Sequence, residues 1–298
     1  MNKSEWLLFL GLGAVWGSSF MWIKIAVQDV GPFALVAWRL LFGSAGMALV
    51  LRLRGISVPR NWLAYRDLIV MGMINTALPF VLISWGEQTV DSAVASILNS
   101  TVPLFTLVIA HFFLAEEEMG RRRVVGLLVG FGGVLLLMSR DLAGGVEASL
   151  VGQLAVLAAA VSYASAAVFA RRRLRQVHSF VQAFIPMLAA DAVVWTLAWP
   201  LEGSSLLPSA ELTWLALIWL GLLGSCVAYM LYFSLLERVG PTRTTLVTYL
   251  IALFGVILGV VFLNEPLDAR LAGGGALVIA GIAVVNWRPR RGERPGIL

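Results

Sequence analysis

The chain has 298 residues, of which 59% are hydrophobic and only 13% are charged, whereas charged residues make up about 25% of a typical soluble domain. This composition excludes a soluble globule and indicates an integral membrane protein. One cysteine and two histidines exclude a disulfide framework and a Cys/His metal cluster, so no metal or other cofactor is expected. The sequence has no GxxxxGK[ST] phosphate loop, which argues against an ATP-driven pump.

Ten apolar stretches predict membrane-spanning helices, each of roughly the 20 residues that a span needs. They cover residues 6–26, 33–51, 67–86, 92–114, 122–138, 150–170, 179–200, 212–236, 242–263 and 270–287. The first stretch lacks a small-residue cleavage site and is expected to be a retained helix, not a signal peptide. Unbroken apolar runs exclude the alternating strands of a barrel, so we expect an all-α membrane protein with no separate soluble domain.

The basic residues in the loops and at the span ends are distributed asymmetrically. Eighteen Lys and Arg residues fall on the side of the N-terminus, and two, Arg140 and Arg270, fall on the other side. The positive-inside rule therefore places both termini in the cytoplasm, and we expect a multi-pass protein of the cytoplasmic (inner) membrane. This distribution over short loops also explains the net charge of +5 without nucleic-acid binding.

The stretch from Leu68 to Leu135 matches the stretch from Leu217 to Val284 without a gap, at an offset of 149 residues. Fifteen of the sixty-eight aligned pairs are identical, which indicates an internal duplication, with one repeat at 1–140 and the other at 141–298. Because the offset contains five spans, an odd number, the second repeat crosses the membrane in the opposite sense. We therefore expect two inverted five-helix repeats around a central cavity, with the functional site between them.

Several motifs resemble the drug/metabolite transporter superfamily, in its EamA-type exporter branch. They are the five-plus-five arrangement, the run from Trp16 to Phe20, Arg39 in the second span, Pro103 in the fourth, and the paired Leu-x-Glu…Gly turns at Leu114–Gly126 and Leu263–Gly275. The second repeat departs from the pattern, with Ala252 where the first has Pro103. The resemblance covers essentially the whole chain and implies a ten-helix transporter with a central cavity. Many members of the family export amino acids or related metabolites.

Polar and aromatic residues inside the spans are the candidates for the substrate site, because unsatisfied polar atoms are costly in lipid. The candidates are Trp16, Ser19, Asn75, Pro79, Asn99, Pro103, Tyr163, Tyr229 and Tyr249. Trp16 is at mid-depth, whereas the other ten tryptophans lie near span ends or in loops, and its indole N–H favours a cavity-lining position. Close helix packing is the alternative role for Ser19.

Prolines follow amide side chains in two of the spans. Asn75 and Pro79 are four residues apart and share a helix face, as do Asn99 and Pro103. Pro103 removes the donor that would bond to the carbonyl of Asn99, so a free carbonyl beside an amide could recognise an amine or a carboxylate. The alternative is a structural kink satisfied by the hydroxyl of Ser100 or Thr101.

Charged and small residues have alternative roles. Lys24 is expected to extend to the interface, whereas Arg39 and Asp191 lie deep enough to bind a coupling ion or to have a structural role, paired with backbone carbonyls. Glu116 and Glu265, which precede Gly-rich helices, are expected to cap helix N-termini. The Gly-x-x-x-Gly pairs Gly126/Gly130 and Gly255/Gly259 predict close helix packing or a dimer contact.

Together these features predict a secondary transporter, not an enzyme, that exports small metabolites by alternating access. Aromatic or large neutral amino acids fit best, because aromatic rings suit an apolar side chain and amides suit a zwitterion. The alternatives are a multidrug or organic-cation exporter of the same superfamily, a membrane enzyme and a channel; we find no reactive cluster for an enzyme. The expected partners are a small-molecule substrate and the lipid bilayer, and we expect a monomer or homodimer.

Overall fold

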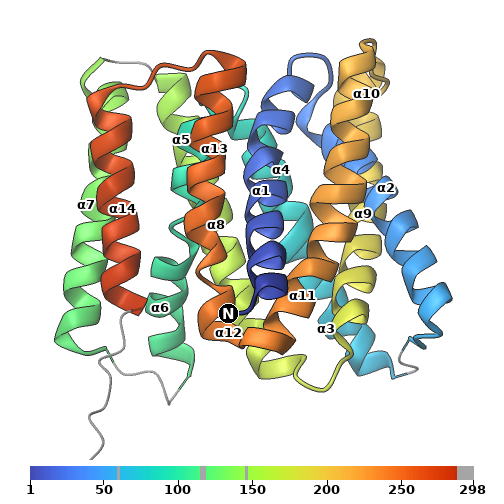
Figure 1. The fold of residues 1–298 in the computed structure, drawn as a ribbon. Coiled ribbons are helices and arrows are strands. Elements are labelled where there is room, and N and C mark those ends of the chain that lie inside the picture. The colour runs from blue at the N-terminus through green and yellow to red at the C-terminus, as the bar shows by residue number, and fades with distance from the viewer. Residues whose placement is uncertain (59–60, 115–118, 145–146, 287–298) are drawn as a thin grey trace, which may run out of the picture.

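The computed structural model describes residues 1–58, 61–114, 119–144 and 147–286, and this part of the chain is a bundle of helices without strands (Figure 1). Six crossings are single helices: α1 (Lys3–Ala26), α2 (Pro32–Arg54), α7 (Arg121–Gly144), α8 (Glu147–Arg173), α9 (Ser179–Glu202) and α14 (Ala269–Asn286). The other four are built from shorter pieces: α3 (Trp62–Gly72), η1 (Met73–Ala77) and α4 (Leu78–Gly86); α5 (Ser92–Asn99) and α6 (Val102–Phe113); α10 (Glu211–Ile218), η3 (Trp219–Val227) and α11 (Ala228–Val239); α12 (Pro241–Thr244) and α13 (Val247–Leu263). The short turn η2 (Gly203–Leu206) follows α9.

Within the described residues, nine helical stretches are long and apolar enough to cross a membrane, and the shorter apolar helix α13 makes the tenth crossing. The prediction of a ten-helix membrane protein is thereby confirmed. Successive crossings alternate in direction, so α1 begins on the face of the bundle where α14 ends (Figure 1). We call this the terminal face, and the opposite one the distal face.

Two of the broken crossings contain π-helices, which the sequence did not predict. These segments, Met73–Ala77 and Trp219–Val227, lie at positions that the 149-residue offset relates to each other. In the first, Pro79 has no N–H, so it cannot donate the i→i+5 bond that the carbonyl of Ile74 would accept. The hydroxyl of Ser162 donates to that carbonyl instead, at 2.6 Å. A side chain from α8 thereby supplies the hydrogen bond that the free carbonyl of the broken helix lacks.

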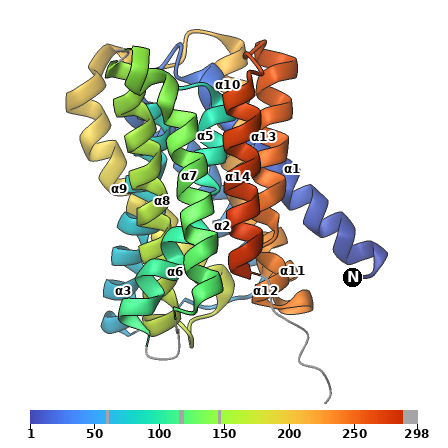
Figure 2. The same cartoon turned by 90° about the vertical axis from the view of Figure 1, so that its left-hand side faces the viewer.

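The glycines of α7 and α14 bring these two helices into close contact (Figure 2). A Cβ added at Gly281 would overlap the backbone of Gly130, and one added at Gly133 would lie 2.6 Å from the carbonyl oxygen of Gly274. The α5 side chain of Ser96 similarly covers Gly255. Of the two roles predicted for the Gly-x-x-x-Gly pairs, the structure therefore shows helix packing within the chain.

Glu265 caps a helix N-terminus, as predicted, but not the N-terminus of the helix that it precedes. Its carboxylate accepts the backbone N–H groups of Ser92 and Ala93 at the start of α5, at 2.7 and 2.9 Å. Asp268 caps α14 instead, through a 2.7 Å bond from a first-turn amide. The contact of Glu265 with α5 could not be predicted from local sequence, because it joins segments more than 170 residues apart. Glu116 lies outside the described residues.

Two more carboxylates bind backbone amides at the distal face. Glu202 accepts two amides in the first turn of α2, at 2.9 and 2.7 Å. Asp29, in the loop after α1, accepts the amides of Ser209 and Ala210 before α10, at 2.9 and 3.0 Å. The hydrogen bonds from the Ser209 side chain and from the Ala210 amide lower the pKa of Asp29 to about 2. With Glu265, these contacts hold the distal ends of the two halves of the chain together, and we call a distal face joined in this way closed.

Candidate functional site

Polar and aromatic side chains from both halves of the chain meet inside the bundle, away from the ends of their crossings. They lie on α1, α2, α8, α11 and the two π-helices. We define the central cluster as Trp16, Arg39, Asn75, Tyr163, Ser225 and Tyr229. Four of these residues are substrate-site candidates from the sequence, Arg39 was a candidate for ion coupling or a structural role, and Ser225 is an addition.

Trp16 finds the hydrogen-bond partner that its indole N–H requires. Its Nε1 donates to the backbone carbonyl of Gly224, in the π-helix η3, at 3.2 Å. The indole ring packs edge-on against Tyr229, with a centroid distance of 6.2 Å, and at 5.6 Å from Tyr232. Trp16 is only partly buried, so part of the ring surface remains available to a ligand.

Each π-helix binds a side chain from the opposite half of the chain. The carbonyl of Ile74 accepts from Ser162 on α8, and the carbonyl of Gly224 accepts from Trp16 on α1. Helices α1 and α8 are the first helices of the two predicted repeats. π-Helical turns occur frequently at functional sites, and here both lie beside the central cluster.

Asn75 and Tyr229 connect the third and eighth crossings. Asn75 Nδ2 donates to the hydroxyl oxygen of Tyr229 at 3.3 Å. Tyr163, on α8, lies close enough to interact electrostatically with Tyr229 and Arg39. The three side chains Asn75, Tyr163 and Tyr229 are partly exposed and therefore offer amide and hydroxyl groups to a bound molecule.

Arg39 is 5% exposed and carries the positive charge of the cluster. Its Nε donates to the hydroxyl of Ser225 at 3.1 Å, and its Cζ lies 3.9 Å from the centroid of the Phe80 ring. Within the described residues, Nη1 and Nη2 have no hydrogen-bond acceptor. The alternative that the sequence left open, pairing with backbone carbonyls, is therefore not what the structure shows. A guanidinium with two free donors is suited to a planar carboxylate.

Ser19 and Pro79 lie next to the cluster. The hydroxyl of Ser19 donates to the carbonyl of Val15 at 3.1 Å, and a Cβ added at Gly224 would lie 3.1 Å from that hydroxyl. Ser19 thus lines the contact between α1 and η3, in line with the packing role. Pro79 is buried at the start of α4, where it contributes to the break in the third crossing.

No hydrogen bond or ring contact among the described residues links the remaining candidates to the central cluster. Asn99 has a buried, unpaired Oδ1 at the end of α5, and Pro103 starts α6 beyond the break. Tyr249 lies beside Asn286, between α13 and α14. Asp191, on α9, is 5% exposed with an unpaired Oδ1 and lies beside Trp195.

The hydroxyls of Ser100 and Thr101 bond to carbonyls near the break, but not to the carbonyl of Asn99, which Pro103 deprives of a donor. Ser100 Oγ donates to the carbonyl of Ser96 at 2.8 Å, and Thr101 Oγ1 donates to the carbonyl of Leu98 at 2.5 Å. Both bonds reach back toward the preceding turn, which stabilises the end of α5. A role for Asn99 and Pro103 in binding substrate stays a prediction.

Sequence reasoning missed two polar contacts inside the bundle. Lys24 does not extend freely to the interface: its Nζ donates to the carbonyls of Glu87 and Val90, at 2.7 and 2.8 Å. Trp219, which was grouped with the interfacial tryptophans, donates from Nε1 to the Ser18 hydroxyl at 3.1 Å. The sequence prediction also omitted Glu87, because this residue directly follows a predicted span and only residues inside the spans were candidates. Its signal in the sequence is a carboxyl group next to a span end.

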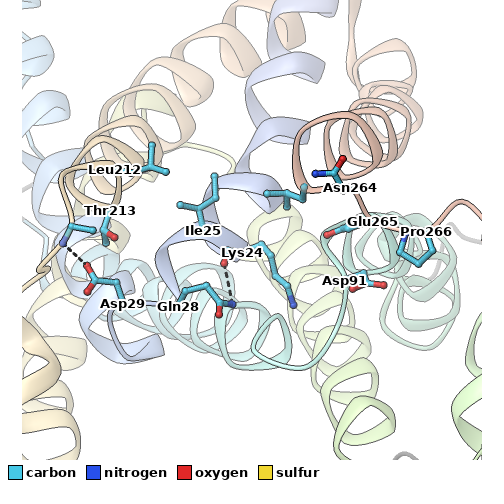
Figure 3. A pocket seen from close by; sticks show the side chains of 12 residues that line it. Lys24, Ile25, Gln28, Asp29, Asp91, Leu212, Thr213, Asn264, Glu265 and Pro266 are labelled. Atoms are coloured by element: carbon cyan, nitrogen blue, oxygen red, sulfur yellow. Dashed lines mark hydrogen bonds between the residues drawn. The ribbon is translucent and has the colours of Figure 1, made fainter.

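Two hollows lie away from the central cluster. The distal hollow, of about 690 Å³, lies between the ends of α1, α10 and α13. Figure 3 shows Asp29 and Thr213 at one end of it, and Glu265 and Asp91 at the other. A second hollow, of about 1010 Å³, lies at the terminal ends of α2, α3 and α9 and includes Tyr65. The capping residues Asp29 and Glu265 line the distal hollow.

Comparison with known proteins gives the class of this one. Residues 3–139 and 150–287 each match the EamA-like transporter family. The chain therefore belongs to the EamA-like transporter family, and it is a membrane transporter.

Several known proteins are similar to this one over most of the chain. The uncharacterized transporter YoaV of Bacillus subtilis (strain 168) is 24% identical, covering 90% of this chain and 91% of its own. The uncharacterized inner membrane transporter YedA of Escherichia coli (strain K12) is 29% identical, with 85% and 81% covered. A probable terminal-alkyne amino-acid exporter of Streptantibioticus cattleyicolor is 27% identical, with 99% of both chains covered. A solved protein crystal structure shares the fold, with a TM-score of 0.68 and 22% identity over 96% of this chain and 98% of the other.

Proposed function

We propose that this transporter exports aromatic or large neutral amino acids across the cytoplasmic membrane by alternating access, with the terminal face in the cytoplasm. The observation that carries the proposal is Arg39, whose Nη1 and Nη2 atoms have no acceptor among the described residues although the side chain is 5% exposed. A substrate carboxylate would complete its hydrogen bonds, and charge-assisted bonds of this kind are the strong ones.

The rings around Arg39 give the other half of the recognition. Trp16, Tyr229 and Tyr232 pack against one another and offer apolar surface for a substrate side chain. The hydroxyls of Tyr163 and Tyr229 and the amide of Asn75 are neutral groups that can hydrogen bond to an ammonium. A probable amino-acid exporter among the full-length relatives supports the same class of substrate.

The same charge disfavours the alternative of an organic-cation exporter, because a cation in the cluster would lie beside the guanidinium of Arg39. We propose a carrier, neither an enzyme nor a channel, that acts as a monomer or homodimer. The contacts that join the two halves at the distal face suit a carrier, because alternating access requires a state in which one face is closed.

Flux measurements on purified protein in liposomes test this function. We expect saturable uptake and counterflow of radiolabelled phenylalanine, little uptake of lysine, and none of a lipophilic cation. Saturable flux of the cation without flux of either amino acid would contradict the proposal and favour the drug-exporter alternative. Flux that neither saturates nor shows counterflow would identify a channel.

A further inference from the structure

Glu87 is the most deeply buried carboxyl group in the described part of the chain. It is 0% exposed, and neither Oε1 nor Oε2 has a hydrogen-bond partner. It follows directly after α4, just outside the span Trp62–Gly86. The carboxylates of Glu265, Glu202 and Asp29, at the same face, each accept two backbone amides. An ionised carboxylate without any donor is costly in a dry site, so the closed distal face favours the neutral form of Glu87.

Three charged groups face Glu87: Lys24 on α1, Arg39 on α2 and Glu265 in the segment before α14. Lys24 directs its ammonium to two backbone carbonyls, and Arg39 bonds to a hydroxyl. Helix α8 packs along α4, but its acidic residue at the distal end, Glu147, is exposed. Burial, the largest cause, and the charge of Glu265 raise the pKa of Glu87 well above its usual range, although Lys24 and Arg39 act to lower it.

The distal hollow ends close to Glu87. Lys24, whose Nζ binds the backbone carbonyl of Glu87, lines that hollow, and Glu265 lines it too (Figure 3). The buried carboxyl and the hollow therefore have Lys24 and Glu265 as common neighbours. If the capped helix N-termini part, the carboxyl becomes hydrated and has the Lys24 ammonium as a neighbour, which favours its ionised form.

We propose that Glu87 is a proton-binding site of the transport cycle, loaded while the distal face is closed and emptied when that face opens. On opening, the O–H bond of the carboxyl breaks, the proton goes to water in the distal hollow, and the carboxylate remains hydrated beside Lys24. On closing, the carboxylate takes a proton from the distal solution. The proposal rests on the alternating-access function, but it concerns a residue outside the central cluster.

The sign of the pH dependence follows from linkage. The closed state binds the proton more tightly than the open state, so the proton favours closure fully below the ordinary pKa of a hydrated Glu. This preference is lost as pH rises toward the higher pKa of the closed state. Between the two values, the ratio of open to closed protein rises by up to about tenfold per pH unit for one linked proton. Asp29 does not produce this effect, because a carboxyl with a pKa of about 2 is ionised throughout that range.

Cysteine reactivity measures the opening without any substrate. In a Cys226→Ala background, Ala26→Cys and Ala93→Cys place thiols at two 0% exposed positions of the distal end, and Gln28→Cys places a reference thiol at an exposed one. The purified protein is held in lipid nanodiscs, so both faces meet the reagent. The rate at each buried position is divided by the rate at Gln28→Cys, which corrects for the titration of a hydrated thiol.

We expect this ratio to rise with pH, by up to about tenfold per unit, in the parent protein and in the Asp91→Asn control, which removes a charge four residues away. In Glu87→Gln, a neutral mimic of the protonated form, the ratio should be low and independent of pH. A ratio that does not change with pH in the parent protein, or that changes equally in Glu87→Gln, would overturn the proposal. If the labelling ratio no longer depends on pH in Asp191→Asn but still does in Glu87→Gln, the proton-binding site is Asp191 and not Glu87.

Transport gives the second readout. Counterflow of phenylalanine should vary with pH in the parent protein and be flat in Glu87→Gln. If the labelling ratio follows the expected pattern but no amino acid moves, the proton site stands and the substrate assignment falls. If phenylalanine moves with the same pH profile in both proteins, the substrate assignment stands and the proton site falls.

Discussion

At the scale of single residues, Arg39 is the unusual feature. Removing a guanidinium from water costs several kcal/mol after relaxation, and only part of that cost is offset within the chain. The ring of Phe80 contributes up to about 2 kcal/mol, and one hydrogen bond involving a charged group contributes about 1.5–3 kcal/mol. Two donor atoms without acceptors are a reason to look for a ligand there, and a carboxylate supplies both acceptors at once.

Tyr229 allows a test of the neutral part of the site. Tyr229→Phe keeps the ring that packs against Trp16 and removes the hydroxyl that accepts from Asn75. A neutral hydrogen bond contributes about 0.5–1.5 kcal/mol, so we expect the apparent affinity for phenylalanine to fall by about 2- to 10-fold with the fold intact. Tyr65→Phe, in the hollow of the terminal face, is the control and should transport normally. Equal transport by both variants would exclude the Tyr229 hydroxyl from the site.

At the scale of helices, the contact between α7 and α14 depends on the absence of side chains. Gly281→Ala places a Cβ against the backbone of Gly130, which cannot rotate away, and overpacking of this kind costs about 1–3 kcal/mol. Gly132→Ala, on α7, meets nothing within 4 Å and should be neutral or stabilising, because alanine favours helix. Thermal unfolding in detergent compares the two. A midpoint for Gly281→Ala at or above that of Gly132→Ala would mean that the helices are not in contact as described.

The sequence predicts the crossings well and their interruptions poorly. Length and apolar composition decide where the crossings lie, and the membrane sets both. The π-helices depend on long-range contacts: Pro79 signals the first one, but the second has no proline and is satisfied by Trp16, more than 200 residues away. Glu265 likewise caps α5 because the two halves fold together. Local patterns carry no information about such pairings.

The central cluster was also predictable only in part, because some of its members are identified only by long-range contacts. A tryptophan or an amide in mid-span is conspicuous in a chain with so few polar residues, which is how Trp16 and Asn75 were found. Ser225 was not predicted because only its contact with Arg39 distinguishes it from other small residues in the spans. Glu87 was not predicted because it lies just after a predicted span, and only residues inside the spans were candidates. Tyr249, like Tyr229, is a tyrosine inside a predicted span, but it lies between α13 and α14. The position of a residue along a helix therefore does not reveal which face of the helix the residue occupies.

At the scale of the whole molecule, the orientation and the two-repeat division stay predictions, and cysteine labelling tests them. The terminal face bears most of the arginines at the ends of the described helices, and η2 lies at the distal face. In a Cys226→Ala background, Ser204→Cys should react in intact cells with an impermeant reagent, whereas Ser57→Cys should react only after lysis. Reaction of both from outside would contradict the inverted five-plus-five arrangement.

The most direct measurement of the central claim compares phenylalanine with phenylalaninamide, which lacks the carboxylate, in counterflow by the parent protein and by Arg39→Gln in liposomes. The parent should prefer phenylalanine. Loss of about 1.5–3 kcal/mol of charged hydrogen bonding should reduce the affinity of Arg39→Gln for phenylalanine by about 10- to 150-fold, whereas the affinity for the amide, which has an ammonium but no carboxylate, should not fall. An unchanged preference for phenylalanine in Arg39→Gln would show that Arg39 does not bind the substrate carboxylate.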